Sequence, residues 1–245
     1  MLINFINLDR RKDRDLAFRQ ANSQHVELAR VRAIDAKTIE PAELRRLLGV
    51  NPKELIYYTK PALCCQLTHE RLWYQAAADR APWTIAEDDA ILRPDFKHQA
   101  EAIIAQLPDQ WDLIYWGWVY RCYLIYELCN AGPAVIAKTS HGWEEGYKPH
   151  MLASDLDSQP YRCYAAWNSF CYTVSPRGAS KLLKLCRPIR DENGRLPFQN
   201  DLFAIYGIDA KMAAITTSLQ AYVAIPPLAM QPYDPKNSDI SPPKG

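Results

Sequence analysis

The stretch Leu2-Ile-Asn-Phe-Ile-Asn-Leu8 is a short apolar run typical of a buried β-strand, and Asp9 follows it directly. A polar, helix-compatible stretch occupies residues 10–24, and Asp9 stands where it would cap that helix. Residues 26–34 resume a strand-like pattern. This order predicts a β-α-β unit at the start of the chain, which is the usual beginning of a parallel sheet.

The same alternation continues through the middle of the chain. The periodicity of apolar residues predicts, in order, a helix over 63–79, a strand at 83–86, a helix over 96–107 and strands at 112–117 and 170–174. Ser175 and Pro176 then fit the N-cap and the first position of a further helix. We therefore expect a single α/β domain with a mostly parallel central sheet flanked by helices.

Two segments depart from this alternation. Residues 118–165 are rich in aromatic residues, Gly and Pro, and we expect a loop-and-hairpin insertion that could serve as a lid or as a platform for a second substrate. Residues 226–245 are rich in Pro, which favours an extended, mobile tail. The expected domain therefore covers residues 1–225, and the Pro-rich tail covers 226–245.

The composition argues against several classes of function. The chain has 245 residues and 48% hydrophobic content, enough for one large α/β domain, and its net charge of +1 gives no electrostatic basis for nucleic-acid binding. The sequence has neither a basic amphipathic stretch nor an apolar run of membrane-spanning length, so at most peripheral membrane association is expected. Seven cysteines without zinc-type spacing, in a chain without a signal peptide, predict reduced thiols and a cytoplasmic location.

Three consecutive acids, Glu87-Asp88-Asp89, follow the apolar run at 83–86. In open α/β sheets, ligands gather outside the carboxyl ends of the strands, where these acids are expected to lie. Like charges this close repel one another, and a hard divalent cation such as Mg²⁺ or Mn²⁺ prefers such oxygen ligands. The alternative is a solvated acidic turn between a strand and a helix.

Basic residues near the first helix offer a second candidate site. Arg11 and Arg14 are three residues apart, so they share one helical face. A helix N-terminus flanked by cations suits an anionic phosphate. The alternative is an ordinary charged face, because Asp9, Asp13 and Asp15 neutralise part of this charge.

Seven short segments match, in the same order, the motifs of one enzyme family. They include INLDRRKDR at 6–14, CQLTHERLW at 65–73, EDD at 87–89 and YTVSPRGASKLL at 172–183, together with 32–36, 111–117 and 197–203. The chain thus resembles glycosyltransferase family 25, which contains lipooligosaccharide and collagen galactosyltransferases. It departs from the family pattern at Ala36, Cys64 and Thr68.

The resemblance implies a GT-A-like, Rossmann-related fold, a nucleotide-sugar donor that is usually a UDP-sugar, a divalent metal and inversion at the anomeric carbon. The expected activity is transfer of a hexose, galactose or glucose, from a UDP-sugar to a glycan, a lipid-linked saccharide or a protein hydroxyl. Two alternatives remain open. One is an inactive module of the same fold that binds nucleotide sugars or glycans, and the other is a metal-dependent phosphodiesterase.

The resemblance also assigns roles to the acidic trio and its neighbours. Asp89 is the expected direct metal ligand, with Glu87 as a second ligand, while Glu87 and Asp88 also contact the donor. Asn7 belongs to the opening motif and is assigned to the donor with them. Arg11 and Arg14 would bind its phosphates.

Three further residues receive roles in the same way. Asp35 could accept a hydrogen bond from uracil N3–H, or it could simply occupy a turn. His69 is either a structural core residue or part of the donor site, and it is not assigned as a metal ligand. Asp201 is the expected general base, with Asp191 and Glu192 as substitutes; the alternative for Asp201 is the N-cap of a helix over 202–206.

Overall fold

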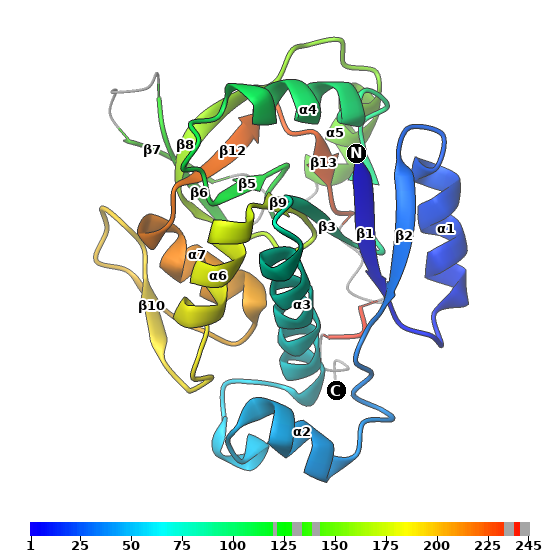
Figure 1. The fold of residues 1–245 in the computed structure, drawn as a ribbon. Coiled ribbons are helices and arrows are strands. Elements are labelled where there is room, and N and C mark those ends of the chain that lie inside the picture. The colour runs from blue at the N-terminus through cyan, green and yellow to red at the C-terminus, as the bar shows by residue number, and fades with distance from the viewer. Residues whose placement is uncertain (120–121, 129–133, 139–142, 233–237, 241–245) are drawn as a thin grey trace.

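Helices and strands alternate along the chain in the computed structural model, which describes residues 1–119, 122–128, 134–138, 143–232 and 238–240 (Figure 1). The strands are β1 (Leu2–Asn7), β2 (Glu27–Arg32), β3 (Trp83–Glu87), β4 (Ile91–Leu92), β5 (Leu113–Tyr115), β6 (Tyr123–Glu127), β7 (Ala134–Lys138), β8 (Gln159–Ala166), β9 (Cys171–Val174), β10 (Asn193–Arg195), β11 (Leu202–Ala204), β12 (Ala221–Ile225) and β13 (Ala229–Met230). The α-helices are α1 (Lys12–Asn22), α2 (Pro41–Leu48), α3 (Lys60–Asp79), α4 (Phe96–Gln106), α5 (Trp143–Leu152), α6 (Pro176–Leu185) and α7 (Ile208–Ile215).

The central sheet has nine strands in the order β2-β1-β3-β9-β5-β12-β8-β6-β7. The pairings β1/β2, β1/β3 and β12/β5 are parallel, whereas β9 runs antiparallel to both β3 and β5. When the directions are followed across the sheet, β2, β1, β3, β5, β12 and β6 point one way, and β9, β8 and β7 point the other. The predicted α/β class with a mostly parallel central sheet is therefore confirmed.

The sheet lies between two layers of helices. Helices α3, α6 and α7 cover one face and lie in front of the sheet in Figure 1, and α1 and α4 cover the other face. Alternate residues of β5 show this division, because Leu113 and Tyr115 pack with the first layer and Ile114 packs with the second. Burial of a strand on both faces explains its continuous apolar run.

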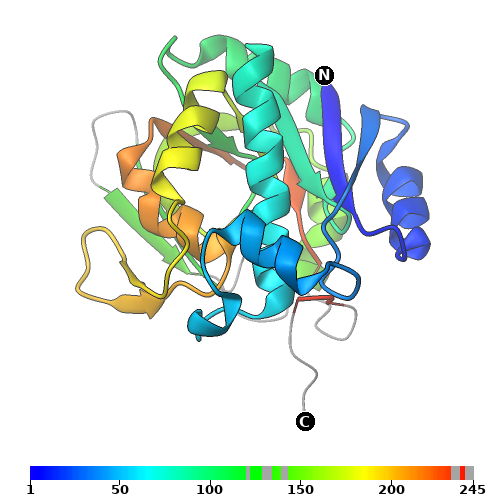
Figure 2. The same cartoon turned by 60° about the horizontal axis from the view of Figure 1, so that its bottom comes forward.

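Helix α2 packs against α3 beyond the sheet, where it comes forward in Figure 2. Leu44 and Leu48 of α2 are buried there beside Leu63 and Leu67 of α3. Each such side chain stabilises the fold by about 1.5–3 kcal/mol through burial. None of the described helices combines the length and the apolar character that a crossing of the bilayer requires.

The start of α6 confirms its predicted capping. The Ser175 side chain accepts a hydrogen bond from the backbone N–H of Gly178 at 3.0 Å, and Pro176 occupies the first turn. A side chain at Gly178 would meet the carbonyl oxygen of Asp112, since its Cβ would lie 1.9 Å away. The glycine lets α6 approach the sheet closely.

Two local predictions are wrong. Asp9 does not cap α1, whose N-cap residue is Arg11; its carboxylate instead pairs with Arg30 and Arg32 of the neighbouring strand, each at 2.7 Å. The predicted helix over 202–206 is also absent from the structure, because β11 starts there and pairs antiparallel with β10. Arginines on the neighbouring strand decide the first case, and pairing with β10 decides the second. Neither partner can be recognised from the local sequence.

The region predicted as an irregular insertion is more regular than its composition suggests. The hairpin is present as β6 and β7, but β8 runs for eight residues inside the central sheet, between β12 and β6. Four of its aromatic residues, Tyr123, Tyr126, Tyr161 and Tyr164, therefore lie on strands of the sheet. Residues 120–121, 129–133 and 139–142 of this region lie outside the described residues.

The prediction of a mobile tail is wrong for its first part. Leu228, Ala229 and Met230 are buried, and β13 pairs with β4. Asp239 is held by arginine side chains of the amino-terminal region. Residues 233–237 and 241–245 lie outside the described part of the chain.

Candidate functional site

A cavity opens at the carboxyl ends of β1 and β3. These strands are parallel neighbours, with Ile6 opposite Glu87, so the residues that follow them meet at one rim of the sheet. The wall is completed by the segment after β2, by one face of α3 and by the tail. The lining residues are Ile6, Asn7, Leu8, Arg10, Arg14, residues 33–37, Pro61, Cys64, Cys65, Thr68, Glu87, Asp88, Asp89, Gln231 and residues 238–240.

The acidic trio lies at this rim as predicted. The chain turns directly after β3, where the backbone N–H of Ala90 donates to the carbonyl of Glu87 at 3.1 Å. This turn directs both Asp88 and Asp89 to Arg14, whose Nη2 lies 2.8 Å and 2.6 Å from their carboxylates. Two amides complete the arrangement.

The side chain of Asn7 donates to Asp88 at 2.6 Å, and that of Gln231 donates to Asp89 at 3.0 Å. Burial raises the pKa of Asp88 to about 6, although Arg14 and Asn7 act against it. Burial and the charge of Glu87 raise the pKa of Asp89 as well. The charged forms of these acids are therefore costly in the present surroundings, and a cation among them would relieve that cost.

The donor set fits a hard divalent cation. Asp88 and Asp89 offer carboxylate oxygens on adjacent residues that face one cavity, and Mg²⁺ and Mn²⁺ prefer such oxygens. Arg14 supplies the compensating positive charge in this structure. A cation at Asp89 would take over that role from the guanidinium.

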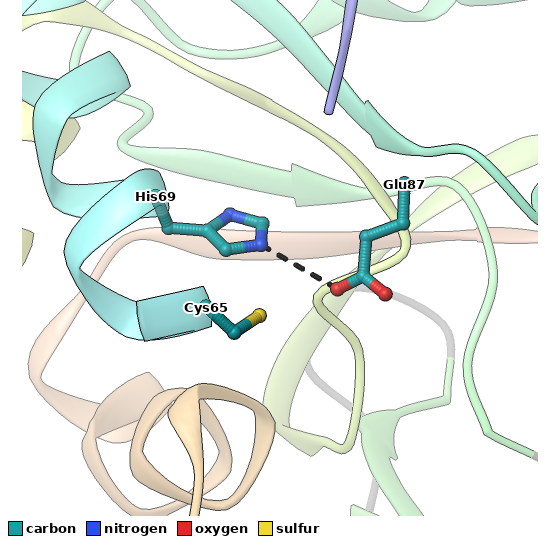
Figure 3. A group of neighbouring side chains, drawn as sticks. All are labelled: Cys65, His69 and Glu87. Carbon is teal, nitrogen blue, oxygen red and sulfur yellow. Dashed lines mark ion pairs between the residues drawn. The ribbon is translucent and has the colours of Figure 1, made fainter. Parts of the chain in front are cut away.

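Glu87 makes different contacts from the other two acids. Its Oε1 lies 3.4 Å from Nε2 of His69, as Figure 3 shows. The other ring nitrogen of His69, Nδ1, is hydrogen-bonded to the Tyr172 hydroxyl at 2.8 Å, and that hydroxyl accepts from Nε1 of Trp73 at 2.8 Å. Burial alone would raise the pKa of Glu87, but His69, Ser169 and Arg14 lower it below its ordinary value. His69 therefore lies behind Glu87 and not in the cavity wall.

A cluster of arginines lies next to these acids, around the carboxylate of Asp239. Arg10 and Arg11 bind that carboxylate at 2.7 Å and 2.6 Å, and Arg14 lies 3.8 Å from it. Although burial opposes it, Arg10 and Arg11 lower the pKa of Asp239. Two guanidinium groups hold this carboxylate and a third lies near it, so the place is suited to an anion.

Asp35 also lines the cavity. One carboxylate oxygen pairs with Nε of Arg10 at 2.9 Å, and the other accepts from the backbone N–H of Lys37 at 2.9 Å. The contact with Lys37 is that of a turn residue, which the sequence left open as an alternative for Asp35. The contact with Arg10 links Asp35 to the arginine cluster.

The three candidate bases are placed differently from the other predicted site residues. Asp201 is exposed at the start of β11 and does not line the cavity. Asp191 accepts from the backbone N–H groups of Ile56 and Tyr57 at 2.7 Å and 3.0 Å, which ties down a loop. Glu192 pairs with Arg190 and Lys211. The last two are thus engaged in structural contacts.

Sequence reasoning missed three residues of this site and one residue outside its lining, Asp209. Arg10 and Gln231 line the cavity, Asp239 occupies the arginine cluster, and Asp209 lies close enough to Glu87 and His69 for their charges to affect its titration. Burial raises the pKa of Asp209. The pair Arg10-Arg11 could have signalled the cluster, but no local pattern marks an acid in a Pro-rich tail.

The family of the chain follows from a comparison with family models. Residues 1–203 match the model described as glycosyltransferase family 25 (LPS biosynthesis protein). The chain belongs to glycosyltransferase family 25. The match includes the acids at 87–89, the arginines of α1 and His69, so these residues are part of the family's own domain. No curated protein sequence matches the chain.

Membership of family 25 makes the protein a glycosyltransferase, and the family description connects it with LPS biosynthesis. Its substrates are accordingly a sugar donor and a glycan acceptor. The cavity brings together a cluster of arginines around one carboxylate and two further carboxylates beside it. The matched region ends before Asp209 and Asp239.

Proposed function

We propose that this member of family 25 is an inverting, metal-dependent transferase that moves a hexose, galactose or glucose, from a UDP-sugar. The acceptor would be a hydroxyl of a glycan, a lipid-linked saccharide or a protein. The observation that carries the proposal is the position of Asp239, whose carboxylate sits among Arg10, Arg11 and Arg14 beside Asp88 and Asp89. A diphosphate could occupy the same position as this carboxylate, with the arginines on one side and the acidic residues on the other.

Each part of the donor then has a binding group in the cavity. Arg10, Arg11 and Arg14 bind the diphosphate in place of Asp239. Asp35 accepts from uracil N3–H, and Asp88, fixed by Asn7, contacts the ribose or the sugar. Arg14 must change partners in this process, because it now spans Asp88 and Asp89.

Asp89 would hold a divalent cation, Mn²⁺ or Mg²⁺, with the oxygen of Glu87 that does not face His69 as a second ligand. When bound, that ion neutralises charge on the departing diphosphate. The remaining electrostatic stabilisation comes from the arginines, whose positive groups are fixed in a partly buried site.

The acceptor hydroxyl must lose its proton to a carboxylate on the side opposite the leaving group. Asp201 remains the sequence-based candidate. Asp209 is a second candidate. Like Asp201 it does not line the cavity, but it lies at the N-terminus of α7 near Glu87 and His69, and its raised pKa suits a base. A cytoplasmic location also remains part of this proposal, on the sequence grounds given above.

The first prediction concerns donor binding. UDP at about 100 times its dissociation constant should stabilise the protein by about 2.7 kcal/mol in the presence of Mn²⁺. For a chain of this size, that corresponds to an increase in Tm of about 5–10 °C, measured by differential scanning fluorimetry. UDP without Mn²⁺ should give a smaller shift.

CMP and GDP serve as controls for recognition of the nucleobase. The proposal is rejected if UDP with Mn²⁺ leaves the Tm unchanged. Acceptor-dependent release of UDP from UDP-galactose or UDP-glucose then separates an enzyme from a binding module of the same fold. Binding without any release across a panel of acceptors would favour the binding module.

The second prediction concerns the tail. The substitution Asp239→Asn should tighten the binding of UDP, because the diphosphate no longer has to displace a charged carboxylate from Arg10 and Arg11. Partly exposed ion pairs contribute about 0.2–1 kcal/mol each, so loss of the two pairs should tighten binding by up to about 30-fold in Kd, measured by isothermal titration calorimetry.

Asp13→Asn is the matched control for that experiment. Asp13 also pairs with Arg11, at 2.8 Å, but it is 64% exposed and does not line the cavity. Its removal should leave the Kd for UDP within a factor of two or so, as is usual for exposed pairs. Weaker UDP binding by Asp239→Asn would show instead that Asp239 positions the arginines for the donor.

A further inference from the structure

Three side chains of different chemistry converge at the edge of the cavity, two of them in its wall and one directly behind it. They are Cys65 and His69, which lie one turn apart on α3, and Glu87 at the end of β3 (Figure 3). The sulfur of Cys65, one ring nitrogen of His69 and a carboxylate oxygen of Glu87 all lie within 4.8 Å of one another. Positions i and i+4 share a helical face, so α3 presents the thiol and the imidazole together.

Two of these atoms lack the partners that buried polar atoms normally have. Among the described residues, neither Nε2 of His69 nor Oε1 of Glu87 makes a hydrogen bond, and both atoms are buried. His69 is 0% exposed. The two atoms face each other at 3.4 Å without the geometry of a hydrogen bond. Such an arrangement is costly in a protein interior unless something lies between the two groups.

The spacing suits a shared ion. Zinc binds imidazole nitrogen at about 2.0–2.1 Å and carboxylate oxygen at about 2.0–2.2 Å, so the two ligand atoms of a tetrahedral site lie about 3.3–3.5 Å apart. The observed separation of Nε2 and Oε1 is 3.4 Å. With a zinc–sulfur bond of about 2.3 Å, the sulfur would lie about 3.6 Å from each of them, which requires it to move closer by at most about 1.2 Å.

The surroundings of His69 also match those of a metal ligand. Its Nδ1 lies 2.8 Å from the hydroxyl of Tyr172, which Trp73 holds in place. If the ring proton is on Nδ1 and is donated to Tyr172, then Nε2 directs its lone pair towards Cys65 and Glu87. Metal-binding histidines usually have such a partner on the second nitrogen, which fixes the tautomer and the ring.

We propose that Cys65, His69 and the Glu87 oxygen that faces His69 bind a zinc-like divalent ion, next to the hard cation assigned to Asp89 and the other Glu87 oxygen. Thiolate and imidazole ligands favour zinc over Mg²⁺ or Mn²⁺, whereas the Asp88–Asp89 pair offers only oxygens. Because Cys65 and Glu87 also line the cavity, the ion would keep a coordination position on the cavity side. The site does not depend on the identity of the sugar donor.

Cobalt provides the test, because a bond between Co²⁺ and a thiolate gives a charge-transfer absorption in the near ultraviolet. The full-length protein is freed of metal with a chelator and titrated with Co²⁺. We expect this absorption to saturate at one equivalent of Co²⁺ and to disappear on addition of Zn²⁺. The substitutions Cys65→Ser and His69→Asn should abolish it.

Two control variants should keep the absorption. Cys64→Ser removes the neighbouring thiol of the same helix, which is not one of the three ligands. Asp89→Asn removes the hard-cation ligand and leaves the three proposed ligands intact. Far-ultraviolet circular dichroism checks that each variant is folded. Tyr172→Phe keeps all three ligands and should lower the affinity for Zn²⁺ about 10- to 100-fold, as loss of an outer partner does.

The site is ruled out if wild-type protein shows no such absorption and takes up no zinc in equilibrium dialysis. It is also ruled out if Cys65→Ser absorbs like wild type, or if Tyr172→Phe binds zinc with unchanged affinity. A negative cobalt titration together with stabilisation by UDP and Mn²⁺ would reject this site and leave the proposed function intact. The reverse result would reject the donor site alone.

Discussion

An Asp89→Asn variant is expected to lose about 10²–10³-fold in transfer activity while it remains folded. The substitution keeps the shape of the side chain but removes the charge that would hold the divalent cation, and loss of one such electrostatic contact typically has an effect of this size. Stability should change little. Burial already disfavours the Asp89 carboxylate, so neutralising it offsets the lost pair with Arg14, which keeps Asp88 as a partner.

The measurement is the rate of UDP release from a UDP-sugar with acceptor, titrated against Mn²⁺. The stabilisation by UDP that depends on Mn²⁺ should disappear in the same variant. Asp109→Asn, at an exposed acid away from the cavity, is the control and should behave like wild type. Normal turnover by Asp89→Asn would show that another residue holds the ion or that the reaction needs none.

A second large effect is expected at Asp209. Asp209→Asn should lower kcat by about 10²–10⁴-fold, the usual contribution of a general base, with little change in the Kd for UDP. The reason is its place at the start of α7, close to Glu87 and His69, and a pKa raised by burial. Steady-state kinetics and calorimetry on the same preparation separate the two quantities.

Asp201→Asn is the matched comparison, because it makes the same chemical change at the residue that the family motif selects. The exposed position of Asp201 at the rim of the β10–β11 hairpin predicts nearly unchanged kcat. If Asp201→Asn loses activity and Asp209→Asn does not, the motif identifies the base correctly and the position in the structure is misleading. If both variants retain activity, the base lies elsewhere.

The fold was predictable where local signals and tertiary contacts agree. The strands at Leu2 and Trp83 are apolar on both faces because helices cover both sides of the sheet, so their runs are continuous and easy to recognise. The capping by Ser175 was also predictable, because the hydrogen bond to Gly178 spans only three residues. Asp9 shows the limit, since the side chains that attract it come from β2.

The same reasoning explains which residues of the site could be predicted from the sequence. Glu87, Asp88 and Asp89 are adjacent in sequence and end a strand, so a single local pattern predicts their common position. Asp239 could not be found in this way, because it reaches Arg10 and Arg11 across more than 200 residues of sequence, from a segment whose composition favours disorder. Asp209 lies only six residues beyond the family match, but its relation to Glu87 depends on how α7 packs.

The place of β9 has a consequence for how the chain folds. The strands β2, β1 and β3 can pair as soon as the first 87 residues are available, but the open side of β3 is closed only by residues 171–174. Until then that edge exposes unpaired backbone groups, which favour association with other chains. Joining the two halves also requires closure of a long loop, which slows folding. Chains truncated before residue 171 should therefore aggregate, and newly made protein should depend most on chaperones at this stage of synthesis.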